Sequence, residues 1–249
     1  PEYIKSVGID TERVLHIPVE HIEQLKFDLV KRLEEIKRGD KVIVFIDSIG
    51  NLASKKEVDD ALEEKSVADM TRAKSIKSLF RIITPHFTTK DIPCVVVNHT
   101  YQEQGLYPKT IMSGGTGPMY SANTIFIIGR QQEKDGGELA GYNFIINVEK
   151  SRYVREKSKI PITVKFDGGL SRWSGLMDMA LEGKFVVKPS NGWYSRVDAT
   201  TGEVETKKWR LGDTDTKEFW LPVISDKAFQ IWVKSTYQVG SGELMSDEH

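Results

Sequence analysis

The sequence contains one cysteine, carries almost no net charge and has no hydrophobic run of membrane-spanning length. Cys94 lies inside the apolar run of residues 92–97, which indicates a buried thiol in a reducing compartment and argues against a disulfide or a cysteine metal site. The net charge of −1 provides no global basic field, so nucleic-acid binding would require a local patch. The sequence also lacks a Gly-x-x-x-x-Gly-Lys-Ser/Thr phosphate loop. Its 249 residues are enough for one substantial core and an appendage.

The most informative stretch is KVIVFIDS, residues 41–48. Five consecutive apolar residues, four of them β-branched, predict a strand buried on both faces that ends at Asp47. Ligands of open α/β sheets bind at the carboxyl ends of strands, and an acid there is typical of a Walker B motif, which holds Mg²⁺ beside nucleotide phosphates. The alternative is a structural turn in which Asp47 caps the next segment.

Hydrophobic periodicity predicts helices around this strand. Apolar residues at steps of three and four indicate a helix over residues 22–36. We expect strands at 14–17 and 41–46 on either side of it. Because a crossover helix joins parallel strands, this order predicts a parallel sheet. After a polar excursion at 54–69 comes a second helix, which we expect Pro85 to end. The opposite face of this helix is either solvated or in contact with an acidic partner; it carries Arg72, Lys74, Lys77 and Arg81.

A second strand is expected to end beside Asp47. The apolar run of residues 92–97 is followed by Asn98 and His99, which we therefore predict at the same sheet edge. Residues 101–123 then read as a long glycine-rich loop with exposed aromatic and methionine side chains. Such a loop either approaches a phosphate chain and stacks bases, or is a plain flexible loop.

The second half of the sequence predicts two further structures. Strands at 124–128, 142–149 and 160–166 have no crossover helix between them, so we expect them to be antiparallel. The basic segment 150–159 between two of them reads as a solvated hairpin tip. All five tryptophans follow residue 170, which predicts a small domain with its own aromatic core.

The order of these segments resembles the RecA family of recombinases. The resemblance is carried by IVFIDS, the polar excursion, the basic-faced helix, VVVNHT, the Gly-Gly loop, IFIIGR, NVEKSR and GLMDMALE with GWYS. Within this family, the sequence most resembles the UvsX recombinases of T4-like phages. The implied fold is α/β, a RecA-like core with a mostly parallel central sheet, antiparallel strands at one side and a small C-terminal α+β domain. The implied boundaries are 1–167 for the core, 168–239 for the small domain and 240–249 for a disordered tail.

The resemblance also implies roles for individual residues. Asp47 matches the Walker B acid that orders Mg²⁺ through water, and its peptide bond to Ser48 matches a cis bond of the family. Asn98 and His99 match the nucleotide-sensing strand end, although bacterial RecA has glutamine at the position of His99. Two cations match those that reach the neighbouring protomer's ATP, Lys150 and Arg152. The DNA-binding positions implied are Arg72, Lys109, Gly114, Gly115 and Tyr120.

The resemblance implies a protein of homologous recombination and DNA repair. Its expected cofactors are ATP and Mg²⁺, and its expected partners are single- and double-stranded DNA, further copies of itself in a head-to-tail filament, and mediator and single-strand-binding proteins. The expected location is the cytoplasm of a bacterium or phage-infected cell. Because the Walker A loop and the catalytic glutamate of the family are missing, we expect a fragment that does not hydrolyse ATP alone. Alternatives are a DNA-binding or filament-interface module, and a RecA-fold helicase or signalling ATPase.

Overall fold

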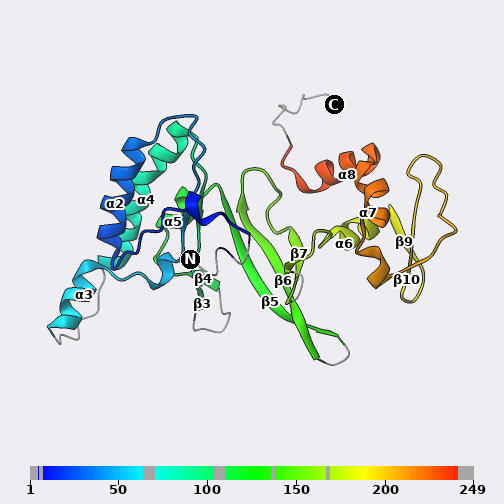
Figure 1. The fold of residues 1–249 in the computed structure, drawn as a ribbon, viewed down its shortest axis with the longest axis horizontal. Helices are drawn as coiled ribbons and strands as arrows, with labels where there is room; N and C mark the ends of the chain where they lie inside the picture. Colours follow the sequence, from blue (N-terminus) through cyan, green and yellow to red (C-terminus); the bar gives the residue numbers. More distant parts are fainter. Residues whose placement is uncertain are drawn as a thin grey trace, which may run out of the picture. The chain divides into compact units, whose positions relative to one another are not determined.

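A computed structural model describes Lys5 and residues 8–63, 71–103, 110–135, 138–166 and 169–240, with the backbone alone for residues 132–135 and 138–140. The chain forms two compact units, Pro1–Ala122 and Asn123–His249. Each unit is considered by itself (Figure 1). Among the helices in the described part of the chain, none is long and apolar enough to cross a membrane.

The first unit contains a parallel strand pair packed against two long helices. Strands β1 and β2 pair in parallel from Val44 opposite Cys94 to Ile46 opposite Val96. The 3₁₀ turns are η1 (Thr11–Arg13) and η2 (Ile49–Asn51); the helices are α2 (Ile22–Glu35), α3 (Lys55–Leu62), α4 (Thr71–Lys90) and α5 (Gly117–Ser121); the strands are β1 (Val44–Ile46), β2 (Cys94–Val96), β3 (Thr100–Gln102) and β4 (Thr110–Met112).

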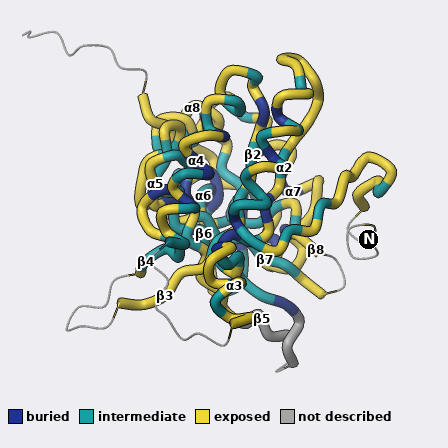
Figure 2. Tube along the Cα trace, turned by 90° about the vertical axis from the view of Figure 1, so that its left-hand side faces the viewer, coloured by how far each residue is buried: buried dark blue, intermediate teal, exposed yellow. Residues whose placement is uncertain are grey.

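Helices α2 and α4 lie side by side and supply most of the first core (Figure 1). Their buried residues recur at helical spacing, with Leu29 and Leu33 on α2 facing the core. Figure 2 shows buried positions interleaved with exposed ones along α2, as one-sided packing requires. The predicted helix at 22–36 is therefore confirmed within one residue. Burial raises the pKa of the nearby Cys94 thiol to about 11, consistent with an unreactive packing residue.

Pro85 does not end α4, contrary to the sequence prediction. The helix continues to Lys90 with Pro85 inside it. The proline removes the hydrogen bond to the carbonyl of Arg81, but both residues are exposed, so water can satisfy that carbonyl. Beyond the proline, Phe87 packs against the core, and its carbonyl accepts a hydrogen bond from the Ile92 amide at 3.0 Å. Tertiary packing therefore outweighs the proline signal.

Three further predictions for this unit were wrong. Residues 14–17 form no strand; they follow η1 without strand pairing, and Leu15 is 69% exposed. The strand ending at Asp47 is buried on one face only, because alternate residues face away from α2 and α4, and Phe45 is 67% exposed. The long loop at 101–123 contains the antiparallel hairpin β3–β4 and helix α5 in its described part.

The second unit contains two antiparallel sheets. The larger sheet has the order β5-β6-β7-β8, and the smaller has the order β11-β10-β9. The predicted antiparallel strands are confirmed, although β5 and β6 extend beyond the predicted ranges. The strands are β5 (Thr124–Asp135), β6 (Glu138–Ser151), β7 (Lys159–Lys165), β8 (Gly169–Leu170), β9 (Val186–Ser190), β10 (Trp193–Arg196) and β11 (Trp209–Arg210); the helices are α6 (Leu176–Glu182), η3 (Leu211–Thr214), α7 (Lys217–Ser225) and α8 (Lys227–Tyr237).

A second core rich in aromatic rings lies among β9–β11 and α6–α8. Phe219 is fully buried, and its ring lies 5.4 Å from that of Trp209 and 4.9 Å from that of Trp220, both edge-on. The predicted aromatic core after residue 168 is thus present. The domain boundary predicted between residues 167 and 168 differs from the division of the chain into two compact units between residues 122 and 123. The predicted domain boundary therefore stays a prediction. The predicted disordered tail lies outside the described residues from 241 onward.

Candidate functional site

The carboxyl ends of β1 and β2 bring two predicted site segments together. Asp47 follows β1 and is exposed, and its peptide bond to Ser48 is cis, as expected. The Ser48 hydroxyl lies 3.2 Å from Nε2 of His99, which follows β2. The two strand ends are also joined by backbone bonds, from the Val97 amide to Ile46 at 2.9 Å and from the Ile49 amide to Val97 at 3.1 Å. The adjacency predicted for these segments is therefore present.

Gly50 permits this close approach, which the sequence analysis did not identify. A Cβ atom added to Gly50 would lie 2.3 Å from Cδ2 of His99 and 3.0 Å from its backbone nitrogen. Any larger residue would therefore displace the imidazole ring. The only signal of this approach in the sequence is a glycine three residues after Asp47.

The end of β2 is tied to the glycine-rich turn through Ser113. The Asn98 side-chain amide donates to the Ser113 carbonyl at 2.9 Å, and the Ser113 amide donates to the His99 carbonyl at 2.9 Å. Gly114 and Gly115 follow with φ angles of +84° and +75°, a region that glycine enters without strain. A Cβ at Gly114 would also lie 2.6 Å from Cδ1 of Ile76. These glycines therefore shape a tight turn against α4.

Arg72, predicted to contact DNA, is engaged within the first unit. Its guanidinium donates to the carbonyls of Leu52 at 2.9 Å, Ile49 at 2.9 Å and Gly50 at 2.7 Å. It also donates to the Ser113 hydroxyl at 3.2 Å. Arg72 thus holds the turn after Asp47 and contacts the start of the glycine-rich turn.

A hollow lies where the basic face of α4 meets the glycine-rich turn. Its volume is about 340 Å³, and it is lined by Ala73, Lys74, Lys77 and residues 115–117. Both lysines are exposed, and neither was among the residues singled out for DNA binding. Tyr120, on α5, is 75% exposed. Lys109 lies outside the described residues.

Lys150 and Arg152 lie in the second unit. Lys150 is near the end of β6, where it pairs with Ile125 of β5, and Arg152 is exposed in the following turn. Both cations therefore belong to a different unit from the strand ends that carry Asp47 and His99.

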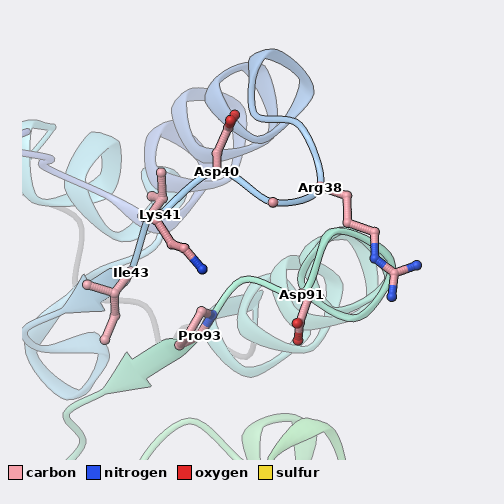
Figure 3. Close-up of a pocket in the computed structure, with 8 residues that line it drawn as sticks. Arg38, Asp40, Lys41, Ile43, Asp91 and Pro93 are labelled. Atoms are coloured by element: carbon pink, nitrogen blue, oxygen red, sulfur yellow. The ribbon is translucent and has the colours of Figure 1, made fainter.

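A larger hollow, of about 510 Å³, opens at the amino ends of β1 and β2, away from Asp47. Figure 3 shows its lining on the turns that precede the two strands. Charges of both signs line it, among them Arg38, Asp40, Lys41 and Asp91. This mixed lining favours neither an anionic nor a cationic ligand.

Comparisons with known proteins give the relationship. Residues 173–233 match the family model described as the C-terminal domain of the bacteriophage T4 recombination and repair protein. Over its full length the chain is 59% identical to the recombination and repair protein of Enterobacteria phage T4. The chain is therefore similar to this phage recombination protein along its whole length. It is also 24% identical over 89% of its length to protein RecA of Ruminococcus albus, and 25% identical over 78% to protein RecA of Streptomyces rimosus.

These relatives confirm the predicted kinship to RecA-type recombinases and the RecA-like α/β fold class. The chain spans 65% of the length of the T4 protein and 53% and 51% of the two RecA proteins. It therefore corresponds to part of each relative.

The strand edge that carries Asp47 fits Mg²⁺ held largely by water. In the part of the chain that the structure describes, no three His, Cys, Asp or Glu side chains gather into a metal cluster. Asp47 instead provides an exposed carboxylate, and the next residue, Ser48, provides a hydroxyl. Mg²⁺ usually keeps several waters and binds one or two carboxylates together with phosphate oxygens. These oxygen donors suit such an ion.

Proposed function

We propose that this chain is the carboxyl-side portion of an ATP-dependent strand-exchange recombinase that binds single-stranded DNA as a helical filament. The observation that supports this most is the joined strand edge, where Ser48 meets His99 and Ser113 connects that edge to the glycine-rich turn. A nucleotide at this edge and DNA at the turn would then share a continuous hydrogen-bonded support. The 59% identity to the T4 recombination and repair protein favours the same activity.

On the nucleotide side, Asp47 would order Mg²⁺ through water beside the phosphates. His99 and Asn98 would sense the terminal phosphate, since both carry side-chain hydrogen-bonding groups at the neighbouring strand end. The imidazole of His99 can donate a hydrogen bond to a phosphate oxygen, in place of the glutamine side chain that bacterial RecA has at this position.

On the DNA side, the hollow between α4 and the glycine-rich turn would hold the backbone. Lys74 and Lys77 offer exposed positive charge, and Gly115 allows close approach of a phosphate chain. The exposed ring of Tyr120 would offer a stacking surface for a base. Lys109 and Gly114 complete the proposed DNA-binding set, and Arg72 would support it indirectly through its hydrogen bonds within the first unit.

Lys150 and Arg152 would act on ATP bound by the neighbouring protomer. Cations supplied in trans stabilise charge on a transferring phosphoryl group, as an arginine finger does. This assignment requires head-to-tail stacking, with one nucleotide at each interface. We extend the proposal to double-stranded DNA, mediator proteins and single-strand-binding proteins as partners, and to the cytoplasm of a bacterium or phage-infected cell as the location.

The test uses the full-length gene product. Affinity for a labelled single-stranded oligonucleotide is measured with and without ATP and Mg²⁺, and filaments are sought by electron microscopy. We expect ATP to raise the affinity and helical filaments to form. Equal affinity with and without nucleotide would favour a DNA-binding or filament-interface module, whereas ring-shaped hexamers would favour a helicase.

The trans cations are tested by the double variant Lys150→Ala, Arg152→Ala. We expect loss of DNA-stimulated ATP hydrolysis by about 10³-fold or more, as for removal of an arginine finger. Lys159→Ala is the matched control, because Lys159 is an exposed cation of the same unit outside the proposed site. Wild-type turnover in the double variant would remove the trans assignment.

A further inference from the structure

The guanidinium of Arg72 joins three segments that are separate in the sequence. An arginine has five N–H donors, and the hydrogen bonds of Arg72 go to three backbone carbonyls of residues 49–52 and to the Ser113 hydroxyl. The carbonyls belong to the η2 turn just after Asp47 and to Leu52, the residue that follows that turn. The Ile49 carbonyl also accepts from the Leu52 amide at 3.4 Å, and a planar guanidinium can bind several such turn carbonyls at once.

Ser113 connects the same guanidinium to the second strand end. Its hydroxyl accepts from Arg72, its amide donates to the His99 carbonyl, and its carbonyl accepts from Asn98. These bonds form a continuous path from both strand ends to Ser113, which precedes Gly114 and Gly115, so a shift of either strand end would pull on Ser113. The reverse also holds, since movement of the glycine-rich turn would pull on both strand ends.

The first turn of α4 is anchored independently, which gives Arg72 a fixed base. The Thr71 hydroxyl donates to Oγ of Ser54, a fully buried residue that caps α3 by accepting from the Glu57 amide at 3.0 Å. The Ser75 hydroxyl donates to the Glu23 carboxylate at 2.5 Å, and the same carboxylate accepts from the Lys55 amide at 2.8 Å. Arg72 therefore projects from a helical turn that α2 and α3 hold in place.

We propose that Arg72 is a positioning residue that couples the strand edge carrying Asp47 and His99 to the glycine-rich turn. This inference rests on the proposed function, because it explains how a nucleotide at the edge would alter DNA affinity at the turn. It also reassigns Arg72, since hydrogen bonds within the protein replace the DNA contact implied by the resemblance.

A first experiment measures hydrogen exchange in the chain without ATP or DNA. Arg72→Gln should speed exchange of the amides in both segments 49–52 and 110–117 by about tenfold or more, because both lose a common anchor. Arg72→Lys should behave similarly, since a single ammonium cannot span acceptors on two segments. Arg81→Gln, an exposed arginine on the same helix, is the matched control and should leave both segments unchanged. Unchanged exchange in both Arg72 variants would overturn the inference.

A second experiment measures coupling in the full-length gene product. The ratio of oligonucleotide affinities with and without ATP should fall by about fivefold or more in both Arg72 variants, within the usual range of allosteric coupling. The salt dependence of DNA binding should keep its slope. A slope reduced by about 0.7 in Arg72→Gln, together with normal affinity in Arg72→Lys, would instead show a direct phosphate contact and overturn the inference.

The two experiments separate this inference from the proposed function. If ATP has no effect on the DNA affinity of the wild-type protein, the proposed function fails, and hydrogen exchange alone decides whether Arg72 holds the two segments. If Arg72→Gln does not fold, Ser113→Ala replaces it, because this change removes one acceptor and leaves the three carbonyl bonds. Faster exchange confined to residues 110–117 would support the inference, and no change there would overturn it.

Discussion

Replacing Gly50 with alanine should force the two strand ends apart at a defined contact. The new Cβ would lie 2.3 Å from Cδ2 of His99, whereas carbon atoms normally approach to about 3.5 Å. The φ angle of Gly50 is outside the positive region, so the expected cost is steric. The imidazole must therefore turn away and give up its 3.2 Å contact with Ser48.

The expected cost is about 1–3 kcal/mol of local stability, the usual range for an overpacked site. Removing the ring by His99→Ala should relieve most of it. In that background the nearest remaining atom is the backbone nitrogen of residue 99 at 3.0 Å, which requires a shift of only a few tenths of an ångström. We therefore expect Gly50→Ala to cost below about 1 kcal/mol there, with a double-mutant interaction energy of about 1–2 kcal/mol.

The assay must report on the first unit. All five tryptophans lie in the second unit, between residues 173 and 232, so tryptophan fluorescence would miss the effect. Hydrogen exchange of the Ile49 and Val97 amides is suitable, because both amides donate across the two strand ends. An equal cost of Gly50→Ala with and without the His99 ring would refute the reasoning, since the ring would not be the obstructing group.

Three further predictions concern the packing. Phe219→Ala should destabilise the second unit by about 3–5 kcal/mol, measured by tryptophan fluorescence in urea, because the ring is fully buried between aromatic neighbours; a loss below about 1 kcal/mol would contradict this. Arg196 donates two hydrogen bonds to Glu205, at 2.9 and 2.6 Å, and holds the pKa of that carboxyl below its usual 4.5. A lowered folded-state pKa stabilises the protein above the unfolded value, so Glu205→Gln should cost about 1 kcal/mol at neutral pH. In urea titrations across pH, that difference should shrink as the pH falls below 4.5, and a constant difference would contradict the ion pair. Pro85→Ala should stabilise α4 by up to about 1 kcal/mol, measured by circular dichroism during thermal unfolding, because it restores a donor to the Arg81 carbonyl; destabilisation would show that the proline ring itself packs.

The sequence predicted the elements whose signals are local and repeated. Apolar steps of three and four placed the helix at 22–36, because one face of a helix must be buried whatever lies beneath it. The two apolar runs placed Asp47 and His99 at strand ends, and parallel pairing then brought these ends together. The local signal of Pro85 was misleading, because the cost of a proline inside α4 depends on whether the carbonyl that loses its hydrogen bond faces water.

Other features depend on which segments meet in space. Three of the four residues 14–17 are apolar, but they pair with no strand in the described part of the chain. The one-sided burial of the strand that includes Phe45 and Ile46 depends on what covers each face. Gly50 became informative only when the ring of His99 was found against it. No spacing rule connects residues 50 and 99.

By itself, the sequence determined the helix at 22–36, the resemblance to RecA-type recombinases and the presence of an acid and an imidazole at neighbouring strand ends. Arg72 marks what only the tertiary structure decided. In the sequence it is one of four cations on a helical face, and the alternatives there are solvent or an acidic partner. In the fold it meets the carbonyls of residues 49, 50 and 52 and the Ser113 hydroxyl. A guanidinium binds whatever acceptors surround it, and those acceptors come from segments up to 41 residues away in the chain.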